Sequence, residues 1–243
     1  MIKGIYDAAS GMMPRVLKQE IFANNMANTN SPGFKKDEVF LQVLSDAAKE
    51  MTPKEFDWEI PMLDDVYVDF EQGSIEMTQN DLDLAIEGDG FFAINTPTGT
   101  RYTRCGVFTT SAVGQLVDGH GNNVLSEAGP IFLPQGQPAF GSDGTISVDS
   151  NIIGKIKIVD FDKPYKLDKS EFGYYKTSDS AAVEKPSANF SLRQGYLERS
   201  NVNIIEEMIN MMTSYRLYEA SQKSIQAQDE TLDKAVNDLG RTT

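Results

Sequence analysis

Two short stretches of this 243-residue chain begin like sites for chemistry, and each lacks a required partner. Asp81 and Asp83 start like a calcium-binding loop, but Ala85 stands where the third oxygen ligand is needed. Gly88-Asp89-Gly90 is not followed by the Gly-Lys-Ser/Thr of a phosphate-binding loop. We therefore expect a turn at the two aspartates and no phosphate site at the glycines.

The chain also has one histidine, His120, and one cysteine, Cys105, which are too few for the usual zinc ligand set. His120 stands in the Gly-rich stretch 118–122, a pattern that predicts an exposed hairpin turn. No nucleophile with a base and no acid–base pair stands out. The sequence thus predicts no catalytic residue, metal site, cofactor or small-molecule substrate, and an enzyme is the third-ranked class.

The strongest pattern is a heptad repeat near the C-terminus, in which apolar residues recur at alternating steps of four and three. A helix over residues 204–239 would be about 54 Å long, more than the width of a domain of ~120 residues. We predict an extended helix that pairs beyond its own domain; the alternative is an ordinary core helix packed on a β domain. The predicted seam is Ile204, Met208, Met211, Tyr215, Tyr218, Gln222, Ile225, Asp229, Leu232, Val236 and Leu239.

A second helix is predicted over residues 2–28, with Pro32 and Gly33 as its stop signal. Pro14 is expected to kink or divide it near Met13. Asn24, Asn25 and Asn28 crowd its end, where their amides would bond across an interface; the alternative is that they only end the helix and start a turn. The interface residues predicted on this helix are Ile5, Met12, Val16, Asn24, Asn25 and Asn28.

The middle of the chain lacks the heptad spacing of the two ends and is dominated by short predicted strands. Residues 38–49 predict a short helix around Val39, Phe40, Val43 and Leu44, and residues 66–70 a strand. From Leu82 onward, short strands alternate with turn signals, as in an antiparallel sheet or barrel. The predicted fold class is α+β: long N- and C-terminal helices pair as a coiled-coil-like inner domain around a central antiparallel β domain. The predicted domains are 1–35 with 200–243 (helical), 36–80 (linking, with a short helix) and 81–199 (β-rich).

Charge and hydropathy narrow the class of partner. The net charge of −14 argues against nucleic acid, and no apolar run is long enough for a membrane span. Residues 1–36 hold five basic and two acidic side chains, a net +3, whereas residues 201–243 hold four basic and seven acidic ones, a net −3. Opposite signs favour pairing the two ends with each other. The first residues lack the pattern of a secretory signal, so we expect a chain that stays in the cytosol or is exported without one.

Several motifs resemble those of flagellar rod and hook proteins. Residues 23–28 (Ala-Asn-Asn-Met-Ala-Asn), followed by Pro32-Gly33-Phe34-Lys35, resemble the N-terminal signature of that family. Residues 200–203 (Ser-Asn-Val-Asn), with 206–209 and 216–219, are similar to its C-terminal signature. Residues 84–92, 102–106 and 114–117 are similar to its β-domain motifs. The resemblance covers nearly the whole chain in the right order.

This resemblance implies a structural subunit of the bacterial flagellar basal-body rod that polymerises through its terminal helices into the torque-carrying axial shaft. It implies self-association, contact with other rod and hook axial proteins, and passage through the flagellar export apparatus into the periplasm without a cleaved signal. Residues 68–73 and 127–131 favour a proximal position in the rod over a distal or hook-type one. The alternative class is a cytosolic coiled-coil dimer whose β module binds a ligand, which predicts a closed oligomer of fixed size.

Overall fold

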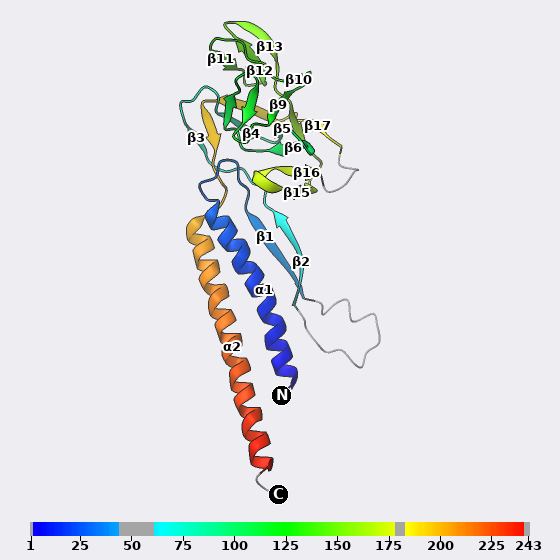
Figure 1. Ribbon diagram of the computed structural model, residues 1–243, viewed down its shortest axis with the longest axis vertical. Coiled ribbons are helices and arrows are strands. Elements are labelled where there is room, and N and C mark those ends of the chain that lie inside the picture. The colour runs from blue at the N-terminus through cyan, green and yellow to red at the C-terminus, as the bar shows by residue number, and fades with distance from the viewer. Residues whose placement is uncertain (1, 44–60, 178–182, 241–243) are drawn as a thin grey trace. The chain divides into compact units, whose positions relative to one another are not determined.

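A computed structural model describes residues 2–43, 61–177 and 183–240 (Figure 1). The chain divides into two compact units. The first takes in residues 1–27, 36–69 and 202–243, and the second takes in residues 28–35 and 70–201. The predicted linking region, 36–80, is thus divided: residues 36–69 lie in the first unit and residues 70–80 in the second, as do residues 28–35.

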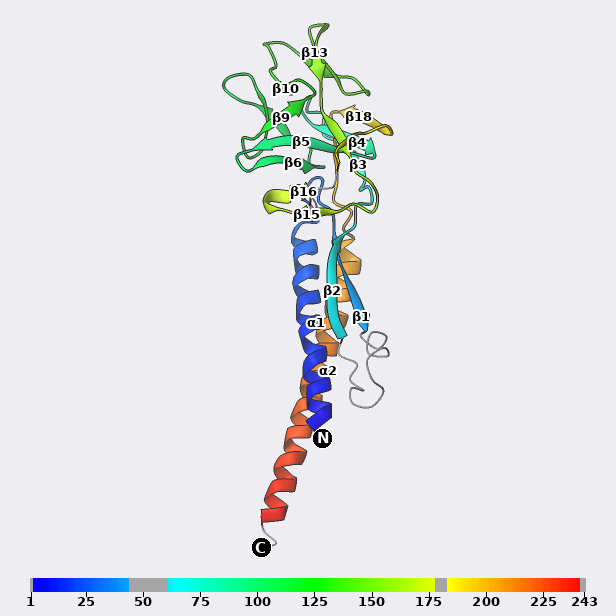
Figure 2. The same cartoon turned by 90° about the vertical axis from the view of Figure 1, so that its right-hand side faces the viewer.

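Two long helices run side by side in opposite directions in the first unit, α1 (Ile2–Ala27) and α2 (Ile204–Gly240) (Figures 1 and 2). Both predicted terminal helices are confirmed. Asn203 caps α2, because its Oδ1 accepts a hydrogen bond from the backbone N of Ile205 at 3.2 Å. Glu206 and Glu207 lie in the first turn, where acidic side chains interact favourably with the positive end of the helix dipole. Neither described helix is long and apolar enough to cross a membrane.

Pro14 does not divide α1, which is continuous from Ile2 to Ala27, so that part of the sequence prediction is wrong. Contacts with α2 lie beside the proline. Arg15 Nη1 donates to the Leu217 carbonyl at 2.6 Å, and Ser214 Oγ donates to the Arg15 carbonyl at 3.1 Å. These contacts help offset the helical hydrogen bond that proline cannot donate.

The first unit also holds a β-hairpin formed by β1 (Asp37–Val43) and β2 (Pro61–Val68). Asp37 pairs with Val68 and Val43 with Pro61, with a register shift after Phe40. The short helix predicted over residues 38–49 is therefore wrong for residues 38–43, and residues 44–49 lie outside the described residues. Residues that pair along a whole neighbouring strand gain ladder hydrogen bonds that a short isolated helix cannot supply. The strand predicted over residues 66–70 is confirmed for residues 66–68, where β2 ends.

The second unit is an assembly of short antiparallel strands, which confirms the predicted antiparallel β domain (Figures 1 and 2). Its largest sheet has ten strands, with β15-β16-β6-β5-β9-β8-β7 as the main path; β11-β12-β13, β18-β4 and β19-β3 form smaller sheets. The strands are β3 (Ile75–Met77), β4 (Leu84–Gly88), β5 (Phe91–Thr96), β6 (Gly99–Thr103), β7 (Phe108–Thr110), β8 (Leu116–Asp118), β9 (Asn123–Ser126), β10 (Gly129–Pro130), β11 (Pro138–Phe140), β12 (Thr145–Val148), β13 (Asn151–Lys155), β14 (Ile158–Asp160), β15 (Leu167–Lys169), β16 (Tyr175–Thr177), β17 (Lys185–Pro186), β18 (Phe190–Gln194) and β19 (Tyr196–Glu198), with a short 3₁₀ helix, η2, at Glu171–Gly173.

The second unit has its own hydrophobic core, drawn from strands far apart in the sequence. Leu84, Ile86, Phe92, Ile94 and Leu116 are completely buried in it. Phe92 packs edge-to-face on the Phe108 ring at 5.1 Å. The overall class is therefore α+β, as the sequence predicts.

Candidate subunit interface

The predicted heptad seam of α2 is divided between two faces of the helix. Every second member, Met211, Tyr218, Ile225 and Leu232, is half-buried, on the same side as the buried Glu207 and Ser214. Four other apolar members, Ile204, Met208, Tyr215 and Val236, are exposed, as are Gln222 and Asp229. Much of the side of α2 that faces α1 is small or polar, so apolar residues remain on another side.

Six exposed apolar residues of α2, three of them members of the predicted seam, form one surface, which we call the apolar strip. It occupies the first three turns of α2, and its members are 43–67% exposed. Helical spacing places them together, turned away from the α1-facing side, and beyond Tyr215 the same face continues with Glu219, Gln222 and Gln226. A contiguous exposed apolar patch of this kind marks a site of protein–protein contact. The apolar strip consists of Ile204, Ile205, Met208, Ile209, Met212 and Tyr215.

The predicted interface residues of α1 are less uniform. Met12 is half-buried and Val16 is exposed, whereas the side chains of Ile5 on α1 and Leu239 on α2 lie outside the described part of the structure. Asn24 is exposed. Asn28 follows the helix and accepts hydrogen bonds from Ser31, as expected of a residue that starts a turn.

Asn25 acts inside the subunit, and its predicted place at the surface is wrong, because only 1% of it is exposed. Its Nδ2 donates to the Asp37 carbonyl at 2.9 Å, and the Asp37 backbone N donates to its Oδ1 at 2.9 Å. The same Nδ2 lies 3.4 Å from Glu207 Oε2. One amide thus ties α1 to both β1 and α2, a use of the asparagine that helix periodicity cannot reveal.

Glu207 makes the stability of the first unit depend on pH. Burial raises the pKa of its carboxyl group above the ordinary value of 4.5, although Asn25 and Lys36 act in the opposite direction. The folded state therefore binds more protons than the unfolded state just above pH 4.5, and stability falls as pH rises through the folded pKa.

We expect Glu207→Gln to increase the free energy of unfolding of the first unit well above pH 4.5 and to leave it nearly unchanged below pH 4.5, where the glutamate is already neutral. Chemical denaturation followed by far-UV circular dichroism at both pH values measures the difference. Glu206→Gln, on the same turn but exposed, is the matched control. A gain of equal size at both pH values would contradict the assignment to titration of Glu207.

Two grooves border the contact between α1 and α2. The basic groove has a volume of about 360 Å³, and its lining includes Gly11, Arg15, Lys18, Phe22 and Leu217. The apolar groove has a volume of about 670 Å³, and its lining includes Val16, Glu20, Met211, Tyr215 and Glu219. The second is continuous with the apolar strip through Met212 and Tyr215.

Gly11 is unusual because glycine inside a helix costs about 1 kcal/mol relative to alanine. A Cβ atom added to Gly11 would meet no described atom within 4 Å, so no described contact of the subunit requires a glycine there. The open space in front of Gly11 belongs to the basic groove.

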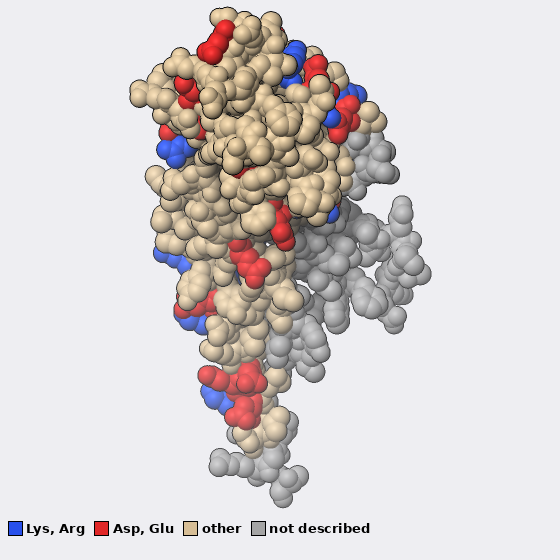
Figure 3. Space-filling model, turned by 45° about the horizontal axis from the view of Figure 1, so that its top comes forward, with Lys and Arg blue, Asp and Glu red and all other residues tan. Residues whose placement is uncertain are grey.

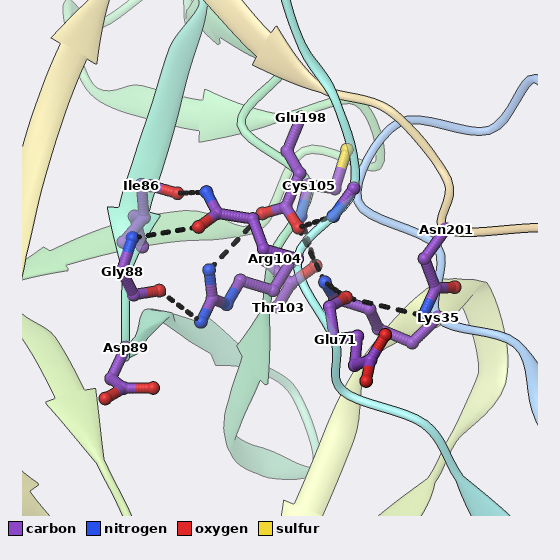
Figure 4. A network of polar contacts seen from close by, with 12 residues as sticks. Lys35, Glu71, Ile86, Gly88, Asp89, Thr103, Arg104, Cys105, Glu198 and Asn201 are labelled. Carbon is purple, nitrogen blue, oxygen red and sulfur yellow. Dashed lines mark hydrogen bonds and ion pairs between the residues drawn. The ribbon is translucent and has the colours of Figure 1, made fainter.

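A buried charge cluster of Lys35, Arg104 and Glu198 holds distant parts of the second unit together (Figure 4). Lys35 Nζ lies 2.6 Å from Glu198 Oε1, and Arg104 Nη1 lies 3.3 Å from Glu198 Oε2. Backbone groups add to it: Lys35 Nζ donates to the Glu71 carbonyl at 2.6 Å, and the Gly73 N donates to Glu198 Oε1 at 3.1 Å. Two buried cations share one carboxylate, so Glu198 makes the burial of both tolerable.

Gly33 brings the segment that follows α1 against this cluster. Its backbone N donates to the Glu198 carbonyl at 2.8 Å, and its φ of +68° is one that glycine adopts readily. A Cβ there would lie 2.3 Å from the Cys105 backbone N. The segment 28–35 and β19, which precedes α2 in the chain, are therefore held in one body. The motif Pro32–Lys35 signals this segment in the sequence and Arg104 lies in the motif 102–106, but neither motif indicates that the two meet at Glu198.

The residues first considered for chemistry have structural roles. The Asp83 N donates to the Asn80 carbonyl at 3.0 Å in a turn, as predicted. His120 is exposed in its hairpin turn, where its backbone N donates to Asp118 Oδ1 at 2.9 Å. Burial raises the pKa of the Cys105 thiol, which disfavours the reactive thiolate. Within residues 2–43, 61–177 and 183–240, no group of three or more His, Cys, Asp or Glu side chains is placed to hold a metal.

Comparison with known proteins identifies the family to which this chain belongs. Three protein-family models match the chain. The family model for the flagella basal body rod protein matches residues 5–35, and the one for the flagellar hook protein FlgE/F/G D1 domain matches residues 85–157. The family model for the flagellar basal body rod FlgEFG protein C-terminal region matches residues 193–239. These three regions contain most of α1 with the whole segment 28–35, the central strands, and nearly all of α2.

Full-length relatives agree with these models. The chain is 33% identical to flagellar basal-body rod protein FlgG of Bacillus subtilis, over 98% of this chain and 99% of the relative. It is 32% identical to FlgF of Caulobacter vibrioides over 99% of both chains. It is also 32% identical to FlgF of Rhizobium meliloti over 99% of both. The chain therefore belongs to the flagellar basal-body rod protein family and is a structural subunit of that rod.

Proposed function

We propose that the terminal helices, residues 1–35 and 200–243, pair in a coiled-coil-like manner and polymerise as the inner layer of the rod, while the β-rich residues 81–199 form its outer part. The apolar strip carries this proposal, because six large apolar side chains of α2 are exposed in the isolated subunit. A second subunit that covers them removes apolar surface from water, at about 25 cal/mol per Å². The remaining predicted seam residues, such as Val16 and Val236, contribute to the same contacts.

An interface of this type that does not close on itself produces a filament rather than a ring or dimer. A rod that transmits torque needs continuous contacts along its axis, and two long helices per subunit supply stiff elements for them. In this proposal the chain crosses the inner membrane through the flagellar export apparatus, without a cleaved signal, and assembles in the periplasm with other rod and hook proteins.

Tyr215→Asp tests the proposal directly. It places an unpaired charge in the apolar strip, which would cost several kcal/mol per interface once buried. We expect rod assembly and swimming to be lost in the native host, while the purified chain unfolds with an unchanged midpoint because Tyr215 is exposed in the subunit. Basal bodies isolated from the cells and viewed by electron microscopy report assembly.

Ser224→Asp is the matched control, because it adds the same charge to an exposed position of α2 outside the apolar strip. This variant should assemble normally. Normal rods with Tyr215→Asp, or a closed oligomer of fixed size at all concentrations in sedimentation, would contradict polymerisation through the apolar strip.

The position along the rod is a finer part of the proposal. Residues 68–73 and 127–131 favour a proximal rather than a distal place. Imaging of basal bodies that carry a labelled chain would locate it.

A further inference from the structure

Within the first unit, α2 extends past the beginning of α1 (Figures 1 and 2). Asn25 contacts Glu207 and Arg15 contacts Leu217, so the two helices run past each other residue for residue in opposite directions. This register sets Ile2 level with about residue 230. Beyond this level, the last turns of α2 therefore have no described residue of α1 beside them. We call residues 229–240 the α2 overhang.

The α2 overhang has the apolar face of a helix that packs against another protein surface. Leu232, Ala235, Val236 and Leu239 recur at three- and four-residue steps, and Val236 is 68% exposed. A segment of ~12 residues is marginal as an isolated helix in water. The pattern indicates that this end of α2 packs on a partner beyond the described residues of the subunit.

The α2 overhang is also acidic. It holds Asp229, Glu230, Asp233 and Asp238 against one basic residue, Lys234, a net −3. Acidic side chains gather at this end of α2 on the molecular surface (Figure 3). A partner surface with basic side chains beside an apolar floor would match both features.

The basic groove has these properties. Arg15 and Lys18 supply positive charge, and Phe22 and Leu217 supply apolar surface. Lys18 makes no ion pair among the described residues, so its charge is available to a partner. The apolar groove on the other side carries the carboxylates of Glu20 and Glu219, which would repel an acidic helix.

Size and shape agree with this match. The groove follows α1 from Gly11 to Phe22, about 17 Å of helix, which equals the length of the α2 overhang at ~1.5 Å per residue. Gly11 has no side chain, so a helix can approach α1 closely there, and no described contact within the subunit uses the space. Alanine would make a better helix at this position, so the glycine is best explained by a neighbouring chain.

We propose that the α2 overhang of one rod subunit docks in the basic groove of the next subunit. This inference rests on the proposed function and specifies one of its contacts. The two surfaces are different parts of the same chain, so the contact is head-to-tail and does not close, as a filament requires. The apolar strip is left free for contacts with other neighbours.

The first test fills the groove. Gly11→Leu places a large side chain in the open space and should leave folding of the purified chain intact, because even its Cβ meets nothing within 4 Å. We expect roughly tenfold fewer complete rods in basal-body preparations. Gly11→Ala, which adds one methyl group, should assemble. Rods formed equally well by Gly11→Leu and Gly11→Ala would overturn the proposal.

The second test exchanges charges. Lys18→Glu alone and Asp229→Lys/Asp233→Lys alone should each reduce rod assembly roughly tenfold at low salt, and the combined chain should recover most of it. Failure of the combined chain to recover, with all three chains folded by circular dichroism, would overturn the docking. Tyr215→Asp distinguishes failure of the docking proposal from failure of the proposed function. If Tyr215→Asp blocks assembly while Gly11→Leu does not, the docking is wrong and polymerisation through the apolar strip stands. If both variants assemble normally, the proposed function itself fails.

Discussion

Glu198→Gln is expected to unfold or severely destabilise the second unit, by about 3–5 kcal/mol. The substitution keeps the size of the side chain, but it removes the charge that Lys35 and Arg104 share and replaces one acceptor oxygen with an NH2 donor. Both buried cations would then lose the carboxylate that they share, while Arg104 would keep its hydrogen bond to the Gly88 carbonyl and its position 5.2 Å from the centre of the Phe91 ring. Hydrogen exchange of the buried β4 and β5 amides measures the loss.

Lys35→Met supplies the comparison, because it removes one of the two cations and leaves Glu198 paired with Arg104. We expect it to cost less than Glu198→Gln, about 1–3 kcal/mol, mainly from the loss of the short hydrogen bond to the Glu71 carbonyl, which keeps the one from Asn201 Nδ2 at 3.3 Å. The order of the two effects follows from the charges left in the cluster: Glu198→Gln leaves two cations without the carboxylate, whereas Lys35→Met leaves one cation with it. If Lys35→Met destabilised the second unit more than Glu198→Gln, the assignment of Glu198 as the shared counter-ion would be wrong.

Gly33→Ala is the second substitution with a large expected effect, about 3 kcal/mol or more. Alanine at a φ of +68° is strained, and its Cβ would lie 2.3 Å from the Cys105 N and 2.4 Å from the Arg104 carbonyl carbon. Both are backbone atoms that no side-chain rotation can move away. The segment 28–35 would have to withdraw from β19, with loss of the hydrogen bond from the Gly33 N to the Glu198 carbonyl. Urea denaturation of the purified chain gives the change in free energy of unfolding.

Gly121→Ala separates strain from collision. Gly121 has a similar φ of +83°, but a Cβ there would have no neighbour within 4 Å. It should cost only the backbone term, about 1 kcal/mol. Equal effects of the two substitutions would mean that close contact at Gly33 contributes nothing, and that residues 28–35 are not anchored through this glycine.

Local patterns were sufficient for part of this structure. The long helices α1 and α2 followed from three- and four-residue spacing, and the turn at His120 followed from glycines and asparagine, because these signals depend on neighbours in the sequence. The same reasoning failed at Val39. Its side-chain pattern alone does not distinguish a short helix from a strand, and pairing with β2, about 25 residues later, decides the outcome.

The sequence by itself determined the α+β class, the antiparallel β domain and the family, since these are recorded in periodicity, turn residues and motifs. Only the tertiary structure decided how those residues are used. Asn25 faces inward because β1 and Glu207 offer partners for its amide, whereas Ile205, Ile209 and Met212 face outward because α1 covers the other side of α2. The pairing of Lys35 with Glu198 joins residues 163 positions apart. Periodicity shows that a helix has a face to bury, but the packing of distant segments determines which face remains for a neighbouring subunit.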